Sequence, residues 1–378
     1  MQNKGLLFIF SSRLSFDRSA RTNRIRSRKG KDCTALPPLE VWFLKAKKYK
    51  TRVLVAFSSF HERFEVKQPT NANHREEALE SKRDLLCRFR KEEKSRATMS
   101  GPLLPPKVTV SFVKEEETIA IVSLLSEPAN AMDLQFWTEL HSALVSLESN
   151  PKTRVLIFLS KLKRDIFTAG NDIKELYAPE TTAKRYEKFW RVQTTFLTRL
   201  LVSPLVTIAG IRGACPAGGA MLSLCCDYRV QTTHKTSSFG LNEVMLGIPV
   251  PKFWALRFCE VTLSKALGEK LLLQGALAKP SEALRYGLID EVCEEGMLEK
   301  RVMEIAEKMK RLPRDGYAKT KINLRGAFAE EWYRYGCEEE AKDGFRMLCE
   351  PTIVKQLKRV LDGLRGGGGG GQQASSKL

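Results

Sequence analysis

Glu243 is the only glutamate in two glycine-containing segments, GACPAGGAMLSLCCDYRV (residues 213–230) and FGLNEVMLGIPV (residues 239–250). The position three residues after Gly218, on the following helical turn, is Met221. One carboxylate can take a proton from carbon and return it, whereas the addition of water across a double bond is best served by two. The two segments therefore predict chemistry in which a single acid moves a proton.

Strand and helix patterns alternate from residue 107 onward and must position these segments. Asp133 opens an amphipathic pattern that runs to Leu147 and stops at Asn150 and Pro151. This alternation predicts an α/β fold, a sheet with helices packed outside. The expected strands are 107–113, 118–125, 154–160, 205–210 and 227–231, and the other expected helices are 182–202 and one that begins near Gly218.

The end of the chain differs in pattern from the middle. Residues 296–364 are helical almost throughout, with breaks at Pro313 and Pro351, and predict a separate helical layer. The expected organisation is an extension over 1–98, a core over 99–295, a helical region over 296–364 and a glycine-rich tail over 365–378.

The positive charge is concentrated in the extension. Of a formal net charge of +19, residues 1–98 carry +13, from 24 Lys and Arg against 11 Asp and Glu. The basic segment 18–31 lacks the interleaved aromatic residues that stack on bases, so a solvated, disordered arm is favoured over nucleic-acid binding. Residues 75–96 are rich in helix formers with opposite charges at three- and four-residue spacing, and could form an exposed helix.

Cysteine and histidine patterns indicate no metal site. The nine cysteines form no CxxC pair, and the four histidines show no ligand spacing. Cys225 and Cys226 fall in an apolar run that predicts a buried helix, so reduced thiols in an intracellular compartment are expected. No run reaches the ~18 apolar residues that span a bilayer.

Two segments favour different organelles. Ser376, Lys377 and Leu378 match the peroxisomal import signal, behind a glycine tether over residues 366–371. The Arg- and Ser-rich, acid-poor composition of roughly the first thirty residues suits a mitochondrial presequence instead. The sequence favours the peroxisome, with import through its receptor, and the mitochondrion is the alternative.

Three blocks in order resemble the crotonase, or enoyl-CoA hydratase/isomerase, superfamily. They are IFTAGNDIKEL (166–176), IRGACPAGGAMLSLCCDYRV (211–230) and FGLNEVMLGIPVPKFW (239–254). The motifs GACPAGG and GLNE are most similar to those of the monofunctional Δ3,Δ2-enoyl-CoA isomerases. The likeness covers roughly residues 107–364, excludes residues 1–98, and implies a spiral of β-β-α units with a C-terminal helical layer.

The resemblance also implies a reaction and a site. The backbone N–H groups of Asn171 and Gly218 would form an oxyanion hole around a thioester carbonyl, and Glu243 would move a proton from C2 to C4 of a 3-enoyl-CoA. A carboxylate over an apolar acyl pocket would have its charged form disfavoured, which makes it a stronger base. The resemblance also implies a homotrimer. The substrate would be an acyl-CoA thioester, so CoA would be part of the substrate and no separate cofactor is expected.

Further residues are expected to contact this substrate. Basic residues of the loop over 161–164 are placed to meet the CoA phosphates, although such residues are usually only solvated. Phe253 and Trp254 would line the acyl pocket, and ordinary helix packing is the equal alternative. The remaining expected contacts are Ala169, Gly170, Asp172, Ile173, Lys174 and Gly219.

Departures from the superfamily patterns limit which of its reactions the chain is expected to catalyse. Met221 stands where the hydratases carry a second glutamate, and Pro251 stands where the dienoyl-CoA isomerases carry an aspartate. Asn171 is polar where many relatives have Ala or Leu, but only its backbone is needed. The alternatives are weak hydration, thioester hydrolysis, or a non-catalytic protein that binds acyl-CoA or RNA.

Overall fold

The computed structural model describes residues 40–45, 52–57 and 105–366. Contacts divide the chain into two units, 1–78 and 79–378. In the first unit, β1 (Glu40–Lys45) pairs with β2 (Arg52–Phe57) in an antiparallel hairpin that the sequence analysis did not predict. The helix predicted over 75–96 and the tripeptide at 376–378 lie outside the described residues.

A six-stranded sheet forms the centre of the second unit, in the order β10-β8-β6-β5-β4-β3. β3 is antiparallel to β4, and all the other pairs are parallel. Every residue of β5 and β6 is buried, as expected for strands covered on both faces. The five predicted strands are thus confirmed as β3 (Val108–Phe112), β4 (Ile119–Leu124), β5 (Val155–Ser160), β6 (Val206–Ile211) and β8 (Tyr228–Thr232), and β10 (Glu291–Cys293) completes the sheet.

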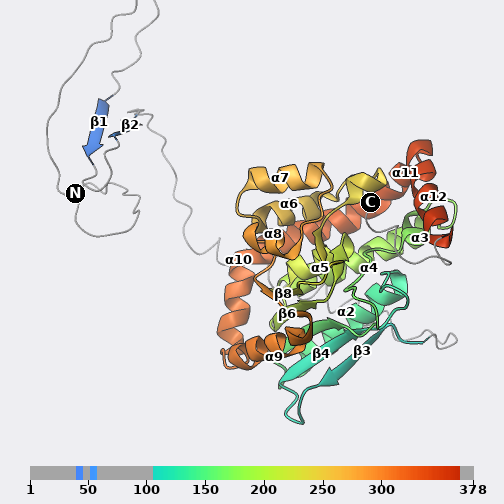
Figure 1. The fold of residues 1–378 in the computed structure, drawn as a ribbon, viewed down its shortest axis with the longest axis horizontal. Helices are drawn as coiled ribbons and strands as arrows, with labels where there is room; N and C mark the ends of the chain where they lie inside the picture. The colour runs from blue at the N-terminus through green and yellow to red at the C-terminus, as the bar shows by residue number, and fades with distance from the viewer. Residues whose placement is uncertain (1–39, 46–51, 58–104, 367–378) are drawn as a thin grey trace, which may run out of the picture. The chain divides into compact units, whose positions relative to one another are not determined.

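The predicted helix starts are also confirmed. The Asp133 carboxylate accepts a hydrogen bond from the Phe136 N–H and caps α2 (Leu134–Ser149). The Thr182 hydroxyl accepts from the Arg185 N–H and caps α4 (Ala183–Leu201). These two helices pack on one another over the sheet, and their buried side chains form much of the core (Figure 1).

The C-terminal region is helical, with breaks at the predicted prolines. It contains α9 (Leu298–Met309), α10 (Arg314–Tyr335), a π-helical turn η3 (Gly336–Glu340), α11 (Ala341–Leu348) and α12 (Pro351–Gly366). The region is not wholly separate from the core. α9 packs directly on the sheet, with Val302 and Ala306 against Ile157 and Ile208, and α10 and α11 pack on α4.

A small parallel sheet joins the two segments that carry the candidate chemistry. β7 (Ala214–Pro216) pairs with β9 (Ser238–Gly240), with Pro216 opposite Gly240. The chain after each strand enters a helix, α5 (Gly218–Cys225) and the 3-10 turn η1 (Glu243–Leu246). The remaining elements are α3 (Ile173–Leu176), α6 (Lys252–Val261), α7 (Lys265–Leu273), α8 (Pro280–Arg285) and η2 (Glu295–Met297).

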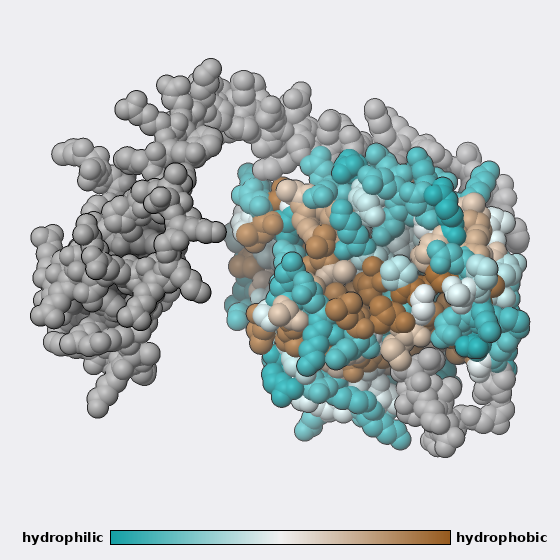
Figure 2. Space-filling model, turned by 90° about the horizontal axis from the view of Figure 1, so that it is seen from above, coloured by the Kyte–Doolittle hydropathy of each residue, from teal (hydrophilic) through white to brown (hydrophobic). Residues whose placement is uncertain are grey.

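Apolar side chains gather on one face of the second unit, bordered by hydrophilic ones (Figure 2). The exposed large apolar residues include Val244 and Met245 of η1, Leu256 of α6 and Leu273 of α7. Within the described ranges, no helix combines the length and the apolar character that crossing a bilayer requires.

Candidate active site

The strand pair β7 and β9 sets the start of α5. The Ala217 N–H donates to the Gly240 carbonyl at 2.8 Å, and Ala217 has a positive φ of 48°. Such a backbone is strained for a residue with a side chain, by about 1–3 kcal/mol, and strain of this kind gathers at functional sites. The turn at Ala217 places the N–H of Gly218 at the N-terminus of a buried helix, where the helix dipole favours negative charge.

The backbone N–H groups of Asn171 and Gly218 lie close together. A carbon placed as Cβ on Gly218 would be 3.4 Å from the Asn171 nitrogen, so covalent geometry puts the two nitrogens at most about 6 Å apart. Among the hydrogen bonds of the described residues, neither N–H has an acceptor. Two unpaired donors at this spacing can both reach one oxygen, the arrangement of an oxyanion hole.

Two of the glycines are required by close packing near these amides. Gly170 has a φ of +85°, which favours glycine, and its N–H donates to the Thr168 hydroxyl at 2.9 Å. A Cβ on Gly219 would lie only 2.1 Å from the Thr168 side chain, so Gly219 lets α5 approach the loop before Asn171. Gly219 therefore has a packing role in addition to the substrate contact that the sequence analysis expected.

The Glu243 carboxyl group is buried. Its exposed fraction is 5%, and among the described residues neither carboxyl oxygen has a hydrogen-bond partner. Burial raises the pKa of Glu243 from 4.5 to about 7, so the group is a stronger base than an ordinary glutamate, as the sequence analysis expected. Two residues lie between it and Gly240, whose carbonyl accepts a hydrogen bond from Ala217, the residue before the Gly218 amide.

Glu243→Gln is expected to change how stability depends on pH. The folded pKa exceeds the unfolded one, so the folded state keeps the proton longer, and stability is lost as pH rises from about 4.5 to about 7. The loss is about 3 kcal/mol at most. Urea unfolding at pH 5 and pH 8 measures this loss. The free energy of unfolding of the variant, relative to that of the wild type, should be higher at pH 8 than at pH 5. Parallel pH dependences in the two proteins would contradict the buried, unpaired carboxyl.

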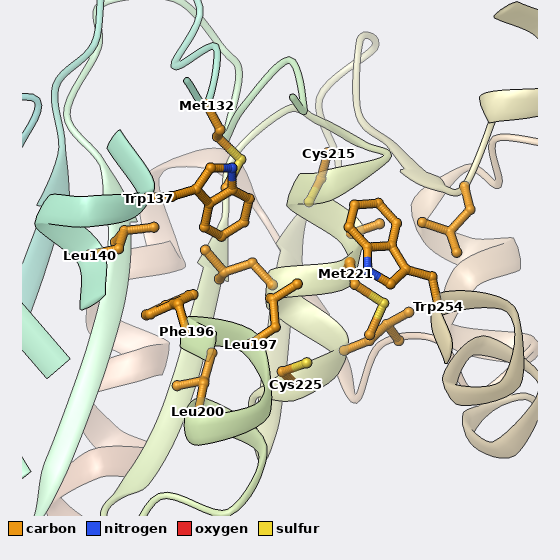
Figure 3. Packing of buried hydrophobic residues seen from close by; sticks show 14 of the residues in the cluster. Met132, Trp137, Leu140, Phe196, Leu197, Leu200, Cys215, Met221, Cys225 and Trp254 are labelled. Carbon is orange, nitrogen blue, oxygen red and sulfur yellow. The ribbon is translucent and has the colours of Figure 1, made fainter. Parts of the chain in front are cut away.

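Met221 gives the site no second acid. It is fully buried in α5 and lies beside Trp254 in the interior (Figure 3). Trp254 is stacked on Trp190 of α4, with ring centroids 6.1 Å apart. Phe253 packs on rings of α10, including Phe328 and Trp332, which favours the packing role over pocket lining.

The start of α6 is held by the C-terminal region. Its N-cap residue, Pro251, offers no side-chain cap. The Glu340 carboxylate of η3 instead accepts from the Lys252 N–H at 3.3 Å, and also from the Trp190 indole at 3.1 Å. The C-terminal helical region thus contacts α6, which carries Trp254, and α4, which carries Trp190.

The side chain of Asn171 is also hydrogen-bonded, whereas the sequence analysis considered only its backbone. Its Oδ1 accepts from the Trp137 indole N–H at 3.1 Å and from the Gln193 amide at 2.6 Å. The sequence analysis named neither donor. Each lies in a helical pattern, α2 or α4, and no local spacing links them to Asn171.

The residues expected near CoA lie in several settings. Lys161 is paired with Glu299 at 2.6 Å, whereas Lys163, Arg164 and Lys174 are exposed. Ala169 is exposed and Ile173 is half-buried. Asp172 caps α3 by accepting from the Lys174 N–H. A cleft of about 450 Å³ is lined by Lys107, Asp133, Asp172, Lys174, Glu175, Glu180 and Arg185.

The cysteines and metal ligands can be described for residues 105–366. Cys225 and Cys226 are buried at the end of α5, and seven cysteines of this range are free thiols. No three His, Cys, Asp or Glu side chains of the described residues are grouped as metal ligands would be.

Comparison with known proteins gives the family. The enoyl-CoA hydratase/isomerase family model matches residues 114–341. The chain belongs to this family. Enoyl-CoA delta isomerase 1, mitochondrial, of Rattus norvegicus is 32% identical over 250 residues, which are 66% of this chain and 85% of that protein. The Homo sapiens protein of the same name is 30% identical over 247 residues, 65% of this chain and 80% of that one.

Solved structures of the enoyl-CoA hydratase/isomerase family match the fold. The human mitochondrial delta3-delta2-enoyl-CoA isomerase has a TM-score of 0.65 and 30% identity, covering 70% of this chain and 100% of that chain. An enoyl-CoA hydratase from Bacillus halodurans has a TM-score of 0.60 and 25% identity, covering 67% and 99%. The chain thus has the predicted crotonase fold, an α/β spiral with C-terminal helices.

Proposed function

We propose that this protein is a Δ3,Δ2-enoyl-CoA isomerase, which converts 3-cis- or 3-trans-enoyl-CoA into 2-trans-enoyl-CoA for β-oxidation of unsaturated fatty acids. Glu243 removes a proton from C2 of the substrate, and the electrons move onto the thioester oxygen as a dienolate. The protonated Glu243 then delivers the proton to C4, and the double bond settles between C2 and C3. Nothing is consumed, so the reaction as written needs no cofactor beyond the CoA of the substrate.

The observation that carries this proposal is the setting of Glu243. Its carboxyl is 5% exposed, lacks a partner among the described residues and has its pKa raised to about 7. A group that must both accept and return a proton near neutral pH works best with such a pKa. Met221, buried where a second acid would be needed for hydration, favours isomerisation within the family.

The two unpaired amides support the electrostatic part of the mechanism. The Asn171 and Gly218 N–H groups are the donors that would meet the charge on the thioester oxygen. A preplaced donor of this kind contributes about 3 kcal/mol to the transition state in other enzymes. The names of the relatives in rat and human, both delta isomerases, agree with the proposal.

The full-length protein is expected to turn 3-hexenoyl-CoA into 2-trans-hexenoyl-CoA. Chromatography of the products, beside a parallel incubation with crotonyl-CoA, separates this reaction from hydration and hydrolysis. Crotonyl-CoA should remain largely unchanged, because water addition is best served by two acids. If 3-hydroxyacyl-CoA or free CoA were the main product, the isomerase assignment would be wrong.

The cellular site and the assembly are further parts of the proposal. Relatives named as mitochondrial support the mitochondrion, the alternative to the peroxisome favoured from the sequence. Import through Ser376, Lys377 and Leu378 stays a prediction, as does the homotrimer. Exposed Val244, Met245 and Leu256 offer apolar surface that an assembly could cover. Removal of residues 1–98 or of Leu378 from a fluorescent fusion distinguishes the two organelles.

A further inference from the structure

The side chain of Asn171 is clamped by donors from two helices. Trp137 of α2 and Gln193 of α4 are both fully buried, and both donate to the same Asn171 oxygen. Figure 3 shows the nitrogen edge of the Trp137 ring turned toward Met132. The backbones of Met132 and Asn171 form an isolated parallel β-bridge. The ring nitrogen and the Asn171 backbone are therefore at the same end of the core.

The orientation of this amide follows from the chemistry of the indole. An indole N–H can only donate, so the oxygen of Asn171, and not its NH2 group, must face Trp137. Gln193 must then turn its own NH2 toward that oxygen. Its Oε1 is left buried and without a partner among the described residues, an arrangement that carries a cost. The folded protein therefore tolerates an unpaired buried oxygen on Gln193, and in this arrangement the Asn171 side chain is held in one orientation.

The clamped oxygen also lies beside Gly218, which would supply the second amide of the site. A Cβ on Gly218 would lie 2.9 Å from the Asn171 oxygen and 3.4 Å from its Cγ. The Asn171 side chain therefore fills the space between the two helices and Gly218. Its position fixes the peptide of Asn171 relative to that of Gly218, although neither donor belongs to the loop or to α5.

We infer that Trp137 and Gln193 are positioning residues for the oxyanion hole, and that they act through the side-chain oxygen of Asn171. They hold the Asn171 N–H at its angle to the Gly218 N–H. The inference rests on the proposed function, since it assigns a role in the same site. Oxyanion-hole donors act only when they are correctly aimed, and small misplacements lower the rate.

A double-mutant cycle in the full-length protein tests this route. Trp137→Phe removes the N–H and keeps most of the ring, and Asn171→Leu removes the acceptor. Each single variant is expected to lower kcat about tenfold with little change in KM, because the donors serve the transition state. The double variant should be no slower than Asn171→Leu alone, because the indole has nothing left to position. A multiplied loss in the double variant would overturn the inference.

Two further variants protect this test from effects on folding. Gln193→Met keeps the volume, removes the second donor and should give the same non-additive pattern with Asn171→Leu. Phe196→Leu is the matched control, because the Phe196 ring packs on the Trp137 ring, with centroids 5.6 Å apart, and has no donor with which to hydrogen-bond the Asn171 oxygen. It should lower the unfolding midpoint and leave kcat unchanged. An equal loss of kcat in Phe196→Leu would reduce Trp137 to a packing residue.

The outcome separates this inference from the proposed function. Wild-type protein that fails to isomerise 3-hexenoyl-CoA contradicts the function alone. The same cycle then applies to hydration or hydrolysis, whichever the wild type catalyses, because an oxyanion hole serves those reactions too. Wild type that isomerises, with kcat unchanged in Trp137→Phe, contradicts only the positioning role.

Discussion

Glu243→Gln is expected to lower isomerase turnover by about a thousandfold or more, since it removes the group that carries the proton. The amide has nearly the same shape, and the carboxyl oxygens have no partners among the described residues that its NH2 group would disturb. Acyl-CoA binding should therefore persist. Turnover of 3-hexenoyl-CoA and calorimetric titration with a saturated acyl-CoA measure the two quantities separately.

Glu148→Gln is a matched control for this change. Glu148 is a half-buried glutamate in the last turn of α2, paired with Arg199 at 2.7 Å. Its replacement makes the same carboxyl-to-amide exchange away from the site and should leave kcat nearly unaltered. Wild-type turnover in Glu243→Gln is the result that the proposed mechanism could not accommodate.

Gly218→Ala should lower kcat by about a hundredfold. The new methyl group would lie 2.9 Å from the Asn171 oxygen, which Trp137 and Gln193 hold in place. Either the peptide of Gly218 or that of Asn171 must shift, and both are donors to the proposed oxyanion hole. The loss of one such donor costs about 2.7–4 kcal/mol in other enzymes, and a hundredfold loss is the lower end of that range. Initial rates over a range of 3-hexenoyl-CoA concentrations separate kcat from KM.

Gly316→Ala is the control for adding a methyl group to a glycine. Gly316 lies in the first turn of α10, and a Cβ there would meet nothing within 4 Å. Alanine favours helix over glycine by about 1 kcal/mol, so this variant should be slightly more stable and fully active. If Gly218→Ala were also fully active, the space between Gly218 and Asn171 would have to be wider than the structure shows.

Much of the fold could be predicted because its signals are local. Asp133 and Thr182 stand directly before helical patterns and cap them, and the apolar runs of β5 and β6 are buried on both faces. The β1–β2 hairpin was missed because residues 1–74 show no sustained strand period.

The site was predicted only as far as its residues lie in contiguous motifs. Glu243 and Gly218 stand in glycine-containing segments, and the pairing of β7 with β9 places the strands that precede them side by side. The clamp on Asn171 was missed because its donors lie 34 and 22 residues away in the chain. Helical periodicity explains Trp137 and Gln193 as buried positions and gives no sign of which polar group they meet.

The hydrogen bonds of Glu340 have a consequence for shortened gene products. Its carboxylate supplies the cap that Pro251 cannot give to α6, and it satisfies the indole of Trp190. A transcript that ended before this codon would also remove Leu348 and Leu357 from the interior. Splice forms or nonsense alleles of that kind should yield insoluble protein rather than a smaller enzyme, even though the codons of Asn171, Gly218 and Glu243 all precede the stop.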